Sequence, residues 1–421
     1  MSEQREAKRG GAAPAEAGRK LSRRDRLFAA AAQQFNRAGI SATSINDIAR
    51  GLGLTRAALY YYVDDREDLV FQCYLRACEL TAEDLGRASE EGRDGLGRVL
   101  AFLRRALAPD RPPTTVLSEI DYLPEALRAV VYKAQRRNVA TLQELITEGM
   151  ADGSIRPCGS EIVAQTLLGI CSWVVLSPDW TGRSGAGAAV LLATIEVLTD
   201  LLTGGLAADP QARFSCPVDV ASFAEPVNLF DRQSTAAQKS NQLIEIASKL
   251  FNRCGVEGAS IDDIVATVGA TKGTFYHYFA DKTELVVRSY GRAFDLAERF
   301  VDTAEAEGAN GLAKSLIGLH LNCQAHIAGP YPLAPGIGIE ALPPTPRRQL
   351  IGRVVRIRDR YAGFGREGIG DGSIRPCDVA ALSLAGAGAF GWIQKWLEDG
   401  EARKWEIADE IAGLFLHGLK G

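Results

Sequence analysis

The sequence predicts an all-α protein in which one helical unit occurs twice. Apolar residues recur at i, i+4 and i+8, the spacing of one helix face, whereas alternating strand patterns are scarce. This stripe is found at Leu27, Ala31 and Phe35 and again at Leu243, Ala247 and Phe251. Glycine and proline separate the helices, as at residues 109–113 and 343–346, because neither residue continues a helix well.

The repetition extends over most of the chain. Residues 35–70 align without a gap with residues 251–286, and 15 of the 36 positions are identical. The motif Asp-Gly-Ser-Ile-Arg-Pro-Cys at 152–158 returns at 371–377, and Trp173 is matched by Trp392. The register changes by only three residues between these matches. We therefore infer duplication of a whole unit of about 200 residues rather than a solenoid of short repeats.

Length and composition narrow the class of protein. With 421 residues, 46% hydrophobic and 24% charged, the chain is long enough for several globular domains. Its apolar runs are too short for a membrane span, and the basic residues near its start precede no apolar core. We expect a cytoplasmic protein without a membrane partner. A net charge of −4 argues against coating nucleic acid by bulk positive charge, so any such site is local.

Metal and disulfide chemistry are not predicted. The eight cysteines contain no Cys-x-x-Cys pair and accompany only four histidines, so neither a zinc framework nor a disulfide scaffold is indicated. His320, Cys323 and His326 have helical spacing but no fourth ligand nearby, which favours packing. No cofactor is expected.

A short helix, a glycine turn and a second short helix occur at the same place in both halves. Ser44 and Ser260 are expected N-caps, each followed by an aspartate three residues later. In the first half a helix at 45–50 leads through Gly51-Leu-Gly-Leu54 into residues 55–62. In the second half, residues 261–266 lead through Gly269 into 271–278. This pattern predicts a helix-turn-helix whose second helix enters the major groove of double-stranded DNA.

The exposed residue types suit that role. The threonine caps and backbone N–H groups can meet phosphate, Arg56 and Lys272 can reach base edges or backbone, and tyrosine or histidine can line the groove wall. Arg66 and Lys282 begin the next helix, where they can clamp backbone. The candidate DNA-binding residues are Ser44, Thr55, Arg56, Ala57, Tyr60, Tyr61 and Arg66, and Ser260, Thr271, Lys272, Gly273, Tyr276, His277 and Lys282. Core packing is expected for Ile45, Ile48, Leu59, Tyr62, Phe275 and Tyr278.

Both segments resemble the DNA-binding domain of the tetracycline-repressor (TetR) family. The second copy carries nearly the whole family pattern, at Gly255, Ile264, Gly269, Thr271, Gly273, Tyr276, His277, Phe279, Lys282 and Leu285. The first copy departs from it at Ala57, Tyr61, Val63 and Arg66. The resemblance implies operator binding, usually repression, that is relieved by a small ligand in the helical domain that follows.

With this resemblance the chain divides into six segments. They are a disordered basic tail at 1–20, a helix-turn-helix DNA-binding domain at 21–68, a helical regulatory domain at 69–206, a linker at 207–237, a second DNA-binding domain at 238–284 and a second regulatory domain at 285–421.

The duplication predicts an intramolecular pseudo-dimer. Family members bind as homodimers, and here one chain carries both recognition helices. We expect helices near 161–176 and 188–202 to pack against those near 379–397 and 407–419, with further dimerisation left open. Because Arg56-Ala-Ala-Leu differs from Lys272-Gly-Thr-Phe, the operator should be an imperfect palindrome.

The effector is less defined. The pattern at 371–378 and 392–396 is similar to family members that sense acyl-CoA thioesters, so an acyl-CoA or another hydrophobic compound is the candidate, although we expect these residues to build the dimerisation face. The candidate pocket walls are Phe102, Leu103, Leu117, Ile120 and Tyr122, and Leu316, Leu319, Leu321 and Ile339, for each of which ordinary core is the alternative.

Two other interpretations compete with this one. An enzyme has weak support from Gly-x-Gly-x-x-Gly at 386–391 and 363–368, but neither match follows a strand as a dinucleotide site requires. A co-regulatory or interaction protein, with only the second DNA-binding domain active, is the alternative to the pseudo-dimer.

Overall fold

The structure is a computed structural model that describes residues 22–53, 55–176, 188–223, 232–334, 336, 338–339, 342–397 and 404–421. The predicted tail at 1–20 and Leu54 of the first turn lie outside these residues. Over the described parts of the chain the secondary structure is helical, with two isolated β-bridges. The prediction of an all-α fold with two helix-turn-helix units is confirmed. No helix in the described ranges is both long and apolar enough to cross a bilayer.

The first half begins with the helices of a small DNA-binding domain. These are α1 (Arg23–Ala38), α2 (Ile45–Gly51) and α3 (Arg56–Leu59), and the first turns of α4 (Arg66–Glu91) complete the domain. A larger domain follows, formed by the rest of α4 with α5 (Gly95–Ala106), the 3-10 turn η1 (Ile120–Tyr122), α6 (Glu125–Asp152), α7 (Ser160–Leu176) and α8 (Ala188–Gly204).

The second half repeats this order with local changes. It contains α9 (Arg232–Gly258), α10 (Ile261–Thr267), α11 (Lys272–Tyr278), α12 (Lys282–Glu307), α13 (Gly311–Ala328), α14 (Pro344–Asp371), α15 (Ala380–Gly391), α16 (Ile393–Trp396) and α17 (Lys404–His417). The break at Gly255, with φ 74° and ψ 168°, sits where Gly39 ends α1 with φ 85°. Both turns need the positive φ that glycine adopts readily.

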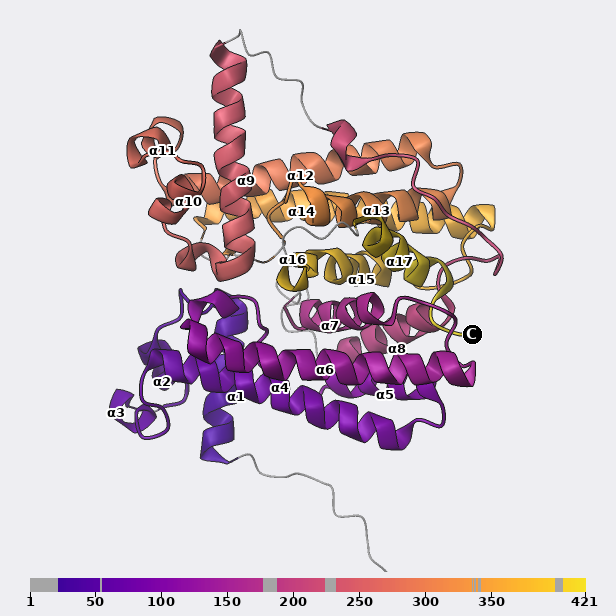
Figure 1. Ribbon diagram of the computed structural model, residues 1–421, viewed down its shortest axis with the longest axis horizontal. Helices are drawn as coiled ribbons and strands as arrows, with labels where there is room; N and C mark the ends of the chain where they lie inside the picture. Colours follow the sequence, from indigo (N-terminus) through magenta and orange to yellow (C-terminus); the bar gives the residue numbers. More distant parts are fainter. Residues whose placement is uncertain are drawn as a thin grey trace, which may run out of the picture.

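The two halves pack through the ends of their larger domains, where α7 and α15 lie together at the centre of the molecule (Figure 1). The helices cross at Gly169 and Gly388. A Cβ atom at Gly169 would lie 2.8 Å from the Gly388 carbonyl oxygen, and one at Gly388 would lie 2.7 Å from the Ile170 Cα. Glycine at both positions therefore allows the two backbones to touch, and the segment at 386–391 serves this contact rather than a nucleotide.

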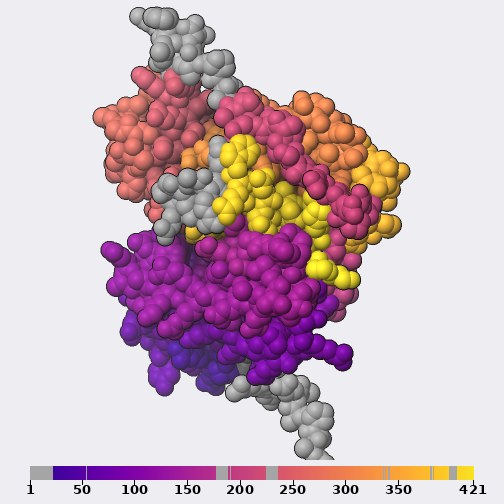
Figure 2. Space-filling view, turned by 45° about the vertical axis from the view of Figure 1, so that its right-hand side comes forward, coloured from indigo at the N-terminus to yellow at the C-terminus, as the bar shows by residue number. Residues whose placement is uncertain are grey.

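The repeated Asp-Gly-Ser-Ile-Arg-Pro-Cys motif also joins the halves. Arg156 Nε donates to the Gly418 carbonyl at 2.7 Å, and Arg375 Nε donates to the Gly205 carbonyl at the same distance. Isolated bridges pair Ile155 with Lys420 and Ala207 with Ile374. The C-terminal residues consequently reach onto the first half, as the space-filling view shows (Figure 2).

The segment predicted as a linker is more ordered than a flexible connection where the structure describes it. Residues 207–223 run to the 3-10 turn η2 (Val220–Phe223), and Val220 is buried among Phe300, Leu321 and other residues of the second half. The Val220 N–H donates to Gln324 Oε1 at 2.7 Å. Residues 224–231 lie outside the described residues, and α9 begins at Arg232, six residues before the predicted boundary.

Candidate DNA-binding surface and effector cavity

The first helix-turn-helix is set up by two capped helix starts. Ser44 Oγ accepts the Asp47 N–H at 3.1 Å to begin α2, and Thr55 Oγ1 accepts the Ala58 N–H at 3.2 Å to begin α3. Each cap satisfies a backbone donor that the helix itself leaves unpaired. Helix α3 has only four residues, after which the chain turns at Tyr60.

Arg56 and Tyr60 form a pair on the surface of α3. Arg56 Nη2 donates to the Tyr60 hydroxyl at 3.0 Å, and the guanidinium lies 5.4 Å from the tyrosine ring centroid. Both side chains are exposed, and Ala57 beside them is exposed as well. The i, i+4 spacing of the two residues was visible in the sequence, but we did not predict the contact.

The second helix-turn-helix has stronger caps and a longer second helix. Ser260 and Asp263 form a reciprocal capping box at the start of α10, and hydrogen bonds from Ser260 lower the pKa of the Asp263 carboxyl. Thr271 Oγ1 accepts the Thr274 N–H at 3.2 Å to begin α11, which has seven residues. The second copy therefore presents nearly two turns of recognition helix, whereas the first presents one.

Lys272 is the basic residue at the start of α11. Its Nζ lies 2.9 Å from Asp262 Oδ2 on α10, which raises the pKa of the lysine. More than half of each side chain is exposed to solvent, so the pair is screened and weak. Gly273 follows in the sequence and is exposed.

Large aromatic side chains stand out from both units. Tyr61 is 84% exposed, Tyr276 is 56% exposed and Tyr60 is 37% exposed, and His277 is also exposed. These side chains belong to short segments at the two recognition helices, whereas single exposed apolar residues elsewhere on a surface are ordinary. By contrast, the residues expected to pack inside, such as Leu59 and Phe275, are fully buried, and Tyr62 and Tyr278 are half-buried.

Arg66 and Lys282 make contacts within the protein. Arg66 Nη2 donates to the carbonyl oxygens of Ile40 and Ser41, and its guanidinium lies over the Tyr122 ring. Lys282 is half-buried, 3.9 Å from Glu257, and burial lowers its pKa. Each residue thus connects the start of the fourth helix of its half to the end of the first helix. That either residue binds the DNA backbone remains a prediction.

The two helix-turn-helix units lie on the same side of the molecule, at the left of Figure 1, with α3 and α11 at its edge. The larger helical domains lie together on the other side. Helix α3, which begins at Arg56, and helix α11, which begins at Lys272, therefore lie at the same side of the molecule.

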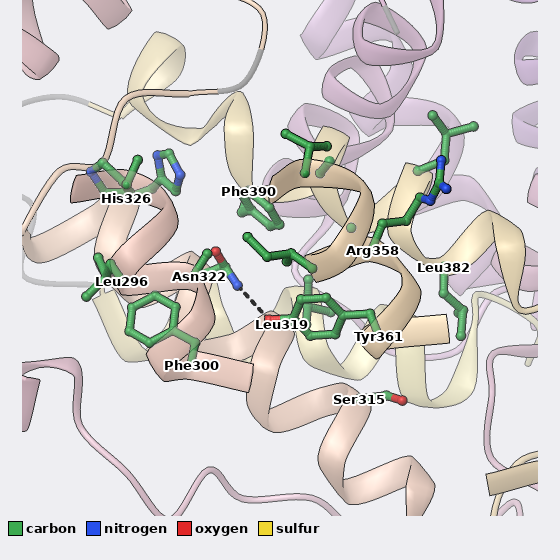
Figure 3. A pocket seen from close by; sticks show the side chains of 18 of the residues that line it. Leu296, Phe300, Ser315, Leu319, Asn322, His326, Arg358, Tyr361, Leu382 and Phe390 are labelled. Atoms are coloured by element: carbon green, nitrogen blue, oxygen red, sulfur yellow. Dashed lines mark hydrogen bonds between the residues drawn. The ribbon is translucent and has the colours of Figure 1, made fainter. Parts of the chain in front are cut away.

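A cavity of about 180 Å³ lies between α12, α13, α14 and α15 of the second half, and Trp173 and Leu206 of the first half complete its wall. Its wall is almost wholly apolar, with Phe300, Leu319 and Phe390 facing its interior (Figure 3). Of the predicted wall residues, Leu316 and Leu319 line this cavity. Leu321 and Ile339 are core residues beside it, and the first-half set Phe102, Leu103, Leu117, Ile120 and Tyr122 packs in the hydrophobic cores of the first half.

A few polar groups interrupt the apolar wall. Asn322 Nδ2 donates to the Tyr361 hydroxyl at 3.1 Å, as the dashed line in Figure 3 shows. The Tyr361 O–H proton can in turn be donated to a ligand. Arg358 also lines the cavity, and His326 lies at its other end. Burial lowers the pKa of His326 to about 3, so this histidine is neutral.

The corresponding positions of the first half are polar. Thr81 and Asp84 stand where the second half has Ala297 and Phe300. Arg111 Nε donates to Asp84 Oδ2 at 2.7 Å, and Arg111 Nη2 lies 3.5 Å from Thr81 Oγ1. The first half therefore has an ion pair at the positions where the second half has the apolar wall of the cavity.

His320 and His326 do not converge. His320 Nε2 lies 3.0 Å from Asp409 Oδ1, and its Nδ1 accepts from Gln324 at 2.8 Å. His326 Nδ1 instead meets Gln394 Nε2 at 3.0 Å. Each ring is thus held by its own amide partner.

Comparisons with known proteins agree with this arrangement. The family described as bacterial regulatory proteins, tetR family, matches residues 27–73 and 243–288, and the family described as tetracyclin repressor-like, C-terminal domain, matches residues 90–183 and 338–419. The uncharacterized HTH-type transcriptional regulator YhgD of Bacillus subtilis (strain 168) is 21% identical over 164 residues, which are 38% of this chain and 85% of that protein.

Solved structures match single halves in the same way. The TetR family regulator PfmR of Thermus thermophilus is 26% identical, with a TM-score of 0.38, over 43% of this chain and all of its own. AibR, solved with isovaleryl coenzyme A and operator DNA, is 23% identical, with a TM-score of 0.35, over 43% of this chain and 98% of its own. The family matches place this chain among transcriptional regulators and not among enzymes. The chain belongs to the TetR family of bacterial regulators and carries two copies of the family's DNA-binding and C-terminal domains in tandem.

Proposed function

We propose that this regulator binds one imperfectly palindromic operator as an intramolecular pseudo-dimer, and that a hydrophobic effector in the second half releases it. The proposal of operator binding rests on one observation: α3 and α11 lie at the same side of the molecule. An operator with two half-sites requires two recognition helices on one side of the protein. The paired packing of α7 and α15 supplies the role that a subunit interface has in a homodimer.

The two recognition helices offer different side chains, which supports unequal half-sites. The first presents Arg56 with Tyr60 and Tyr61, and the second presents Lys272 with Tyr276 and His277. Arginine can bond a guanine edge with two parallel donors, whereas lysine acts as a point charge. The first half-site should therefore carry the stronger base preference at the position that Arg56 meets.

The effector is proposed from the chemistry of the cavity. An engineered apolar cavity of about 150 Å³ holds benzene, so about 180 Å³ accommodates a compact ring system or a short acyl chain. Tyr361 and Arg358 would meet a single polar or anionic end. If the effector is an acyl-CoA, only its acyl chain fits inside, and the coenzyme would lie outside the cavity.

The DNA proposal is tested with Arg56→Ala, Lys272→Ala and the double variant. Operators selected by the full chain from random duplexes provide the probe, and fluorescence anisotropy at several salt concentrations provides the affinity. Each single change should weaken binding about 5- to 150-fold, because a good base contact contributes about 1–3 kcal/mol. In the double variant the salt slope should fall by about 2, since each lost phosphate contact lowers it by about 1.

Arg87→Ala is the matched control, because Arg87 is exposed on α4 towards the end remote from the DNA-binding domain. Equal affinity and equal salt slope for the double variant and the control would overturn the assignment.

A second candidate function, in which only the second DNA-binding domain contacts DNA, has one observation in its favour. Helix α3 has four residues against seven in α11, and Arg56 is already bonded to Tyr60. Footprinting separates the two: protection of two half-sites supports the pseudo-dimer, and protection of one supports a first domain that has become an interaction surface.

A further inference from the structure

A half-buried lysine on the short helix α16 contacts the second DNA-binding domain and a loop of the first half that adjoins the first DNA-binding domain. Lys395 Nζ donates to the carbonyl oxygens of Ser118 in the first half and Asn252 in the second, and lies 3.4 Å from the Arg253 carbonyl. Asn252 and Arg253 stand just before the break in α9, so the lysine holds the end of the first helix of the second DNA-binding domain. One ammonium group thus bonds backbone from both halves.

Glu119 connects the same point to the first DNA-binding domain. Its Oε2 accepts the Ser41 N–H at 3.1 Å and the Ser41 hydroxyl at 3.2 Å, just after the end of α1. The carboxylate lies between the two equivalent turns. A Cβ added at Gly39 would lie 2.6 Å from Oε1, and one added at Gly255 would lie 2.5 Å from Cδ.

Electrostatics makes this junction costly to disturb. Glu119 is 9% exposed and Lys395 is half-buried. Burial raises the pKa of Glu119 and lowers that of Lys395 to about 8, while each charge favours the ionised form of the other. An ion-paired neighbour, Arg253 with Asp121 at 3.5 Å, crosses the same boundary. Separating the two halves here would leave the buried Glu119 carboxylate without the nearby ammonium group of Lys395.

Gln394, the residue before the lysine, is hydrogen-bonded to both α9 and the wall of the cavity. Asn252 Nδ2 donates to Gln394 Oε1 at 3.0 Å. Because that oxygen accepts, the Gln394 amide nitrogen is the donor to His326 Nδ1 at 3.0 Å. His326 lines the cavity, as does Pro332, whose carbonyl also accepts from Asn252 at 2.9 Å. Hydrogen bonds therefore run without a gap from the cavity wall to α9.

The junction has no duplicate. Positions equivalent to Gln394 and Lys395 in the first half are Val175 and Leu176, and the position equivalent to Glu119 in the second half is Gly338. Within the residues that the structure describes, this polar junction is therefore built from different residues of the two halves, and its Gln394 bonds His326 of the cavity wall.

We propose that α16 is the coupling element that sets the relative position of both DNA-binding domains, with Lys395 as the positioning residue and Gln394 as its link to the cavity. This proposal rests on the proposed function, because it concerns how an effector would reach the recognition helices. A ligand that moves His326 or Phe390 moves the end of α15 and with it α16, which begins two residues after α15 ends. The hydrogen bonds from Lys395 to Ser118 and Asn252 then rearrange, and the two DNA-binding domains change from one relative position to another, as a two-state switch requires.

The test measures the distance between the two DNA-binding domains in the full chain. Spin labels carried by genetically encoded residues at Arg50 and Ala266, equivalent exposed positions on α2 and α10, leave the native cysteines untouched. The wild type should give one narrow distance distribution, and Lys395→Met should broaden it. Gln349→Leu, at an exposed site on α14, should leave it unchanged.

A double variant separates positioning from stability. Lys395→Met leaves Glu119 buried without its cation and should lower Tm, whereas Glu119→Gln with Lys395→Met removes both charges and should recover Tm. If Lys395 positions the domains, the distribution stays broad in the double variant. A narrow, wild-type distribution in either variant overturns the proposal, because the lysine would then serve stability alone.

Naphthalene, an apolar probe of suitable size, tests the link to the cavity. It should shift the distance in the wild type, and Gln394→Leu should retain naphthalene binding by thermal shift but lose at least half of that distance change. An unaltered response in Gln394→Leu overturns the link. If naphthalene does not bind the wild type, the cavity part of the proposed function is contradicted, and the probe-free variants still decide the positioning role.

Discussion

The interiors of the two regulatory domains have diverged although their helices have not. In the second half, Ala297 and Phe300 face a cavity of about 180 Å³, whereas the equivalent Thr81 and Asp84 bind Arg111. Asn138, which bonds the Cys78 carbonyl at 2.9 Å, stands where the second half has Ile357. The same helix framework thus carries a hollow apolar interior in one copy and a polar network in the other. In the function proposed above, the effector binds only the second interior, and the polar network of the first contributes to stability.

The largest expected effect comes from giving the second half the first half's residue. Phe300→Asp buries a carboxyl group in the apolar wall without the counterpart of Arg111 that pairs with Asp84 in the first half, and removes a fully buried ring. We expect a loss of about 3–5 kcal/mol of stability, the range for truncating a buried Phe, together with loss of naphthalene binding. Chemical denaturation and thermal shift measure the two effects. A variant as stable as the wild type would show that the second interior accepts a buried carboxyl group, and the proposed difference between the two interiors would be wrong.

A more specific exchange is available at Gly386. This buried glycine lines the cavity, and its first-half equivalent is Leu167. A Cβ at Gly386 meets nothing closer than Leu319 Cδ1 at 3.7 Å, so a larger side chain can grow into the hollow. Gly386→Leu should weaken naphthalene at least about tenfold and keep the fold, because leucine also favours helix by up to about 1 kcal/mol over glycine. Gly386→Ala is the control and should retain most binding.

Calorimetry of the same probe addresses the stoichiometry. The comparison predicts one naphthalene per chain in the wild type and none in Gly386→Leu. Two equivalent sites per chain would mean that the first half also binds apolar ligands, and the prediction that only the second half does so would be wrong.

The smallest effect is expected for the polar network of the first half. Asp84→Asn breaks an ion pair whose side chains are only 12% and 15% exposed, and should cost about 1–3 kcal/mol, the penalty for leaving a buried group unsatisfied. Asp302→Asn breaks the exposed pair with Arg360 in the second half and should cost less than about 1 kcal/mol. Naphthalene affinity should not change in either variant. Weaker binding in Asp84→Asn would show that the two interiors communicate.

The sequence identified much of this molecule because its signals are local. Ser44 and Ser260 cap their helices as predicted. The duplicated motif was expected only to contribute to a dimerisation face. The structure shows in addition that its arginines, Arg156 and Arg375, each donate a hydrogen bond to the opposite half. The roles of the candidate DNA-binding residues remain predictions. For Arg66 and Lys282, the internal contacts depend on residues in other helices and could not be read from spacing.

The long-range features were beyond reach of the sequence. Glu119 and Lys395 are 276 positions apart, and nothing in the local pattern of either residue indicates the other. The cavity also depends on how four helices pack, which differs between the copies through single substitutions such as Asp84 against Phe300. The alignment of the halves does expose these substitutions, so a comparison of the two copies, position by position, is the signal that could have found them.

The crossing of α7 and α15 at Gly169 and Gly388 has a consequence for synthesis on the ribosome. Helix α7 buries Leu167, Ile170 and Trp173, yet its partner α15 is made about two hundred residues later. At about 5–20 residues per second this leaves the apolar face uncovered for about 10–40 s. During that interval two nascent first halves on one messenger can pair with each other, so the tandem arrangement competes with assembly between neighbouring chains.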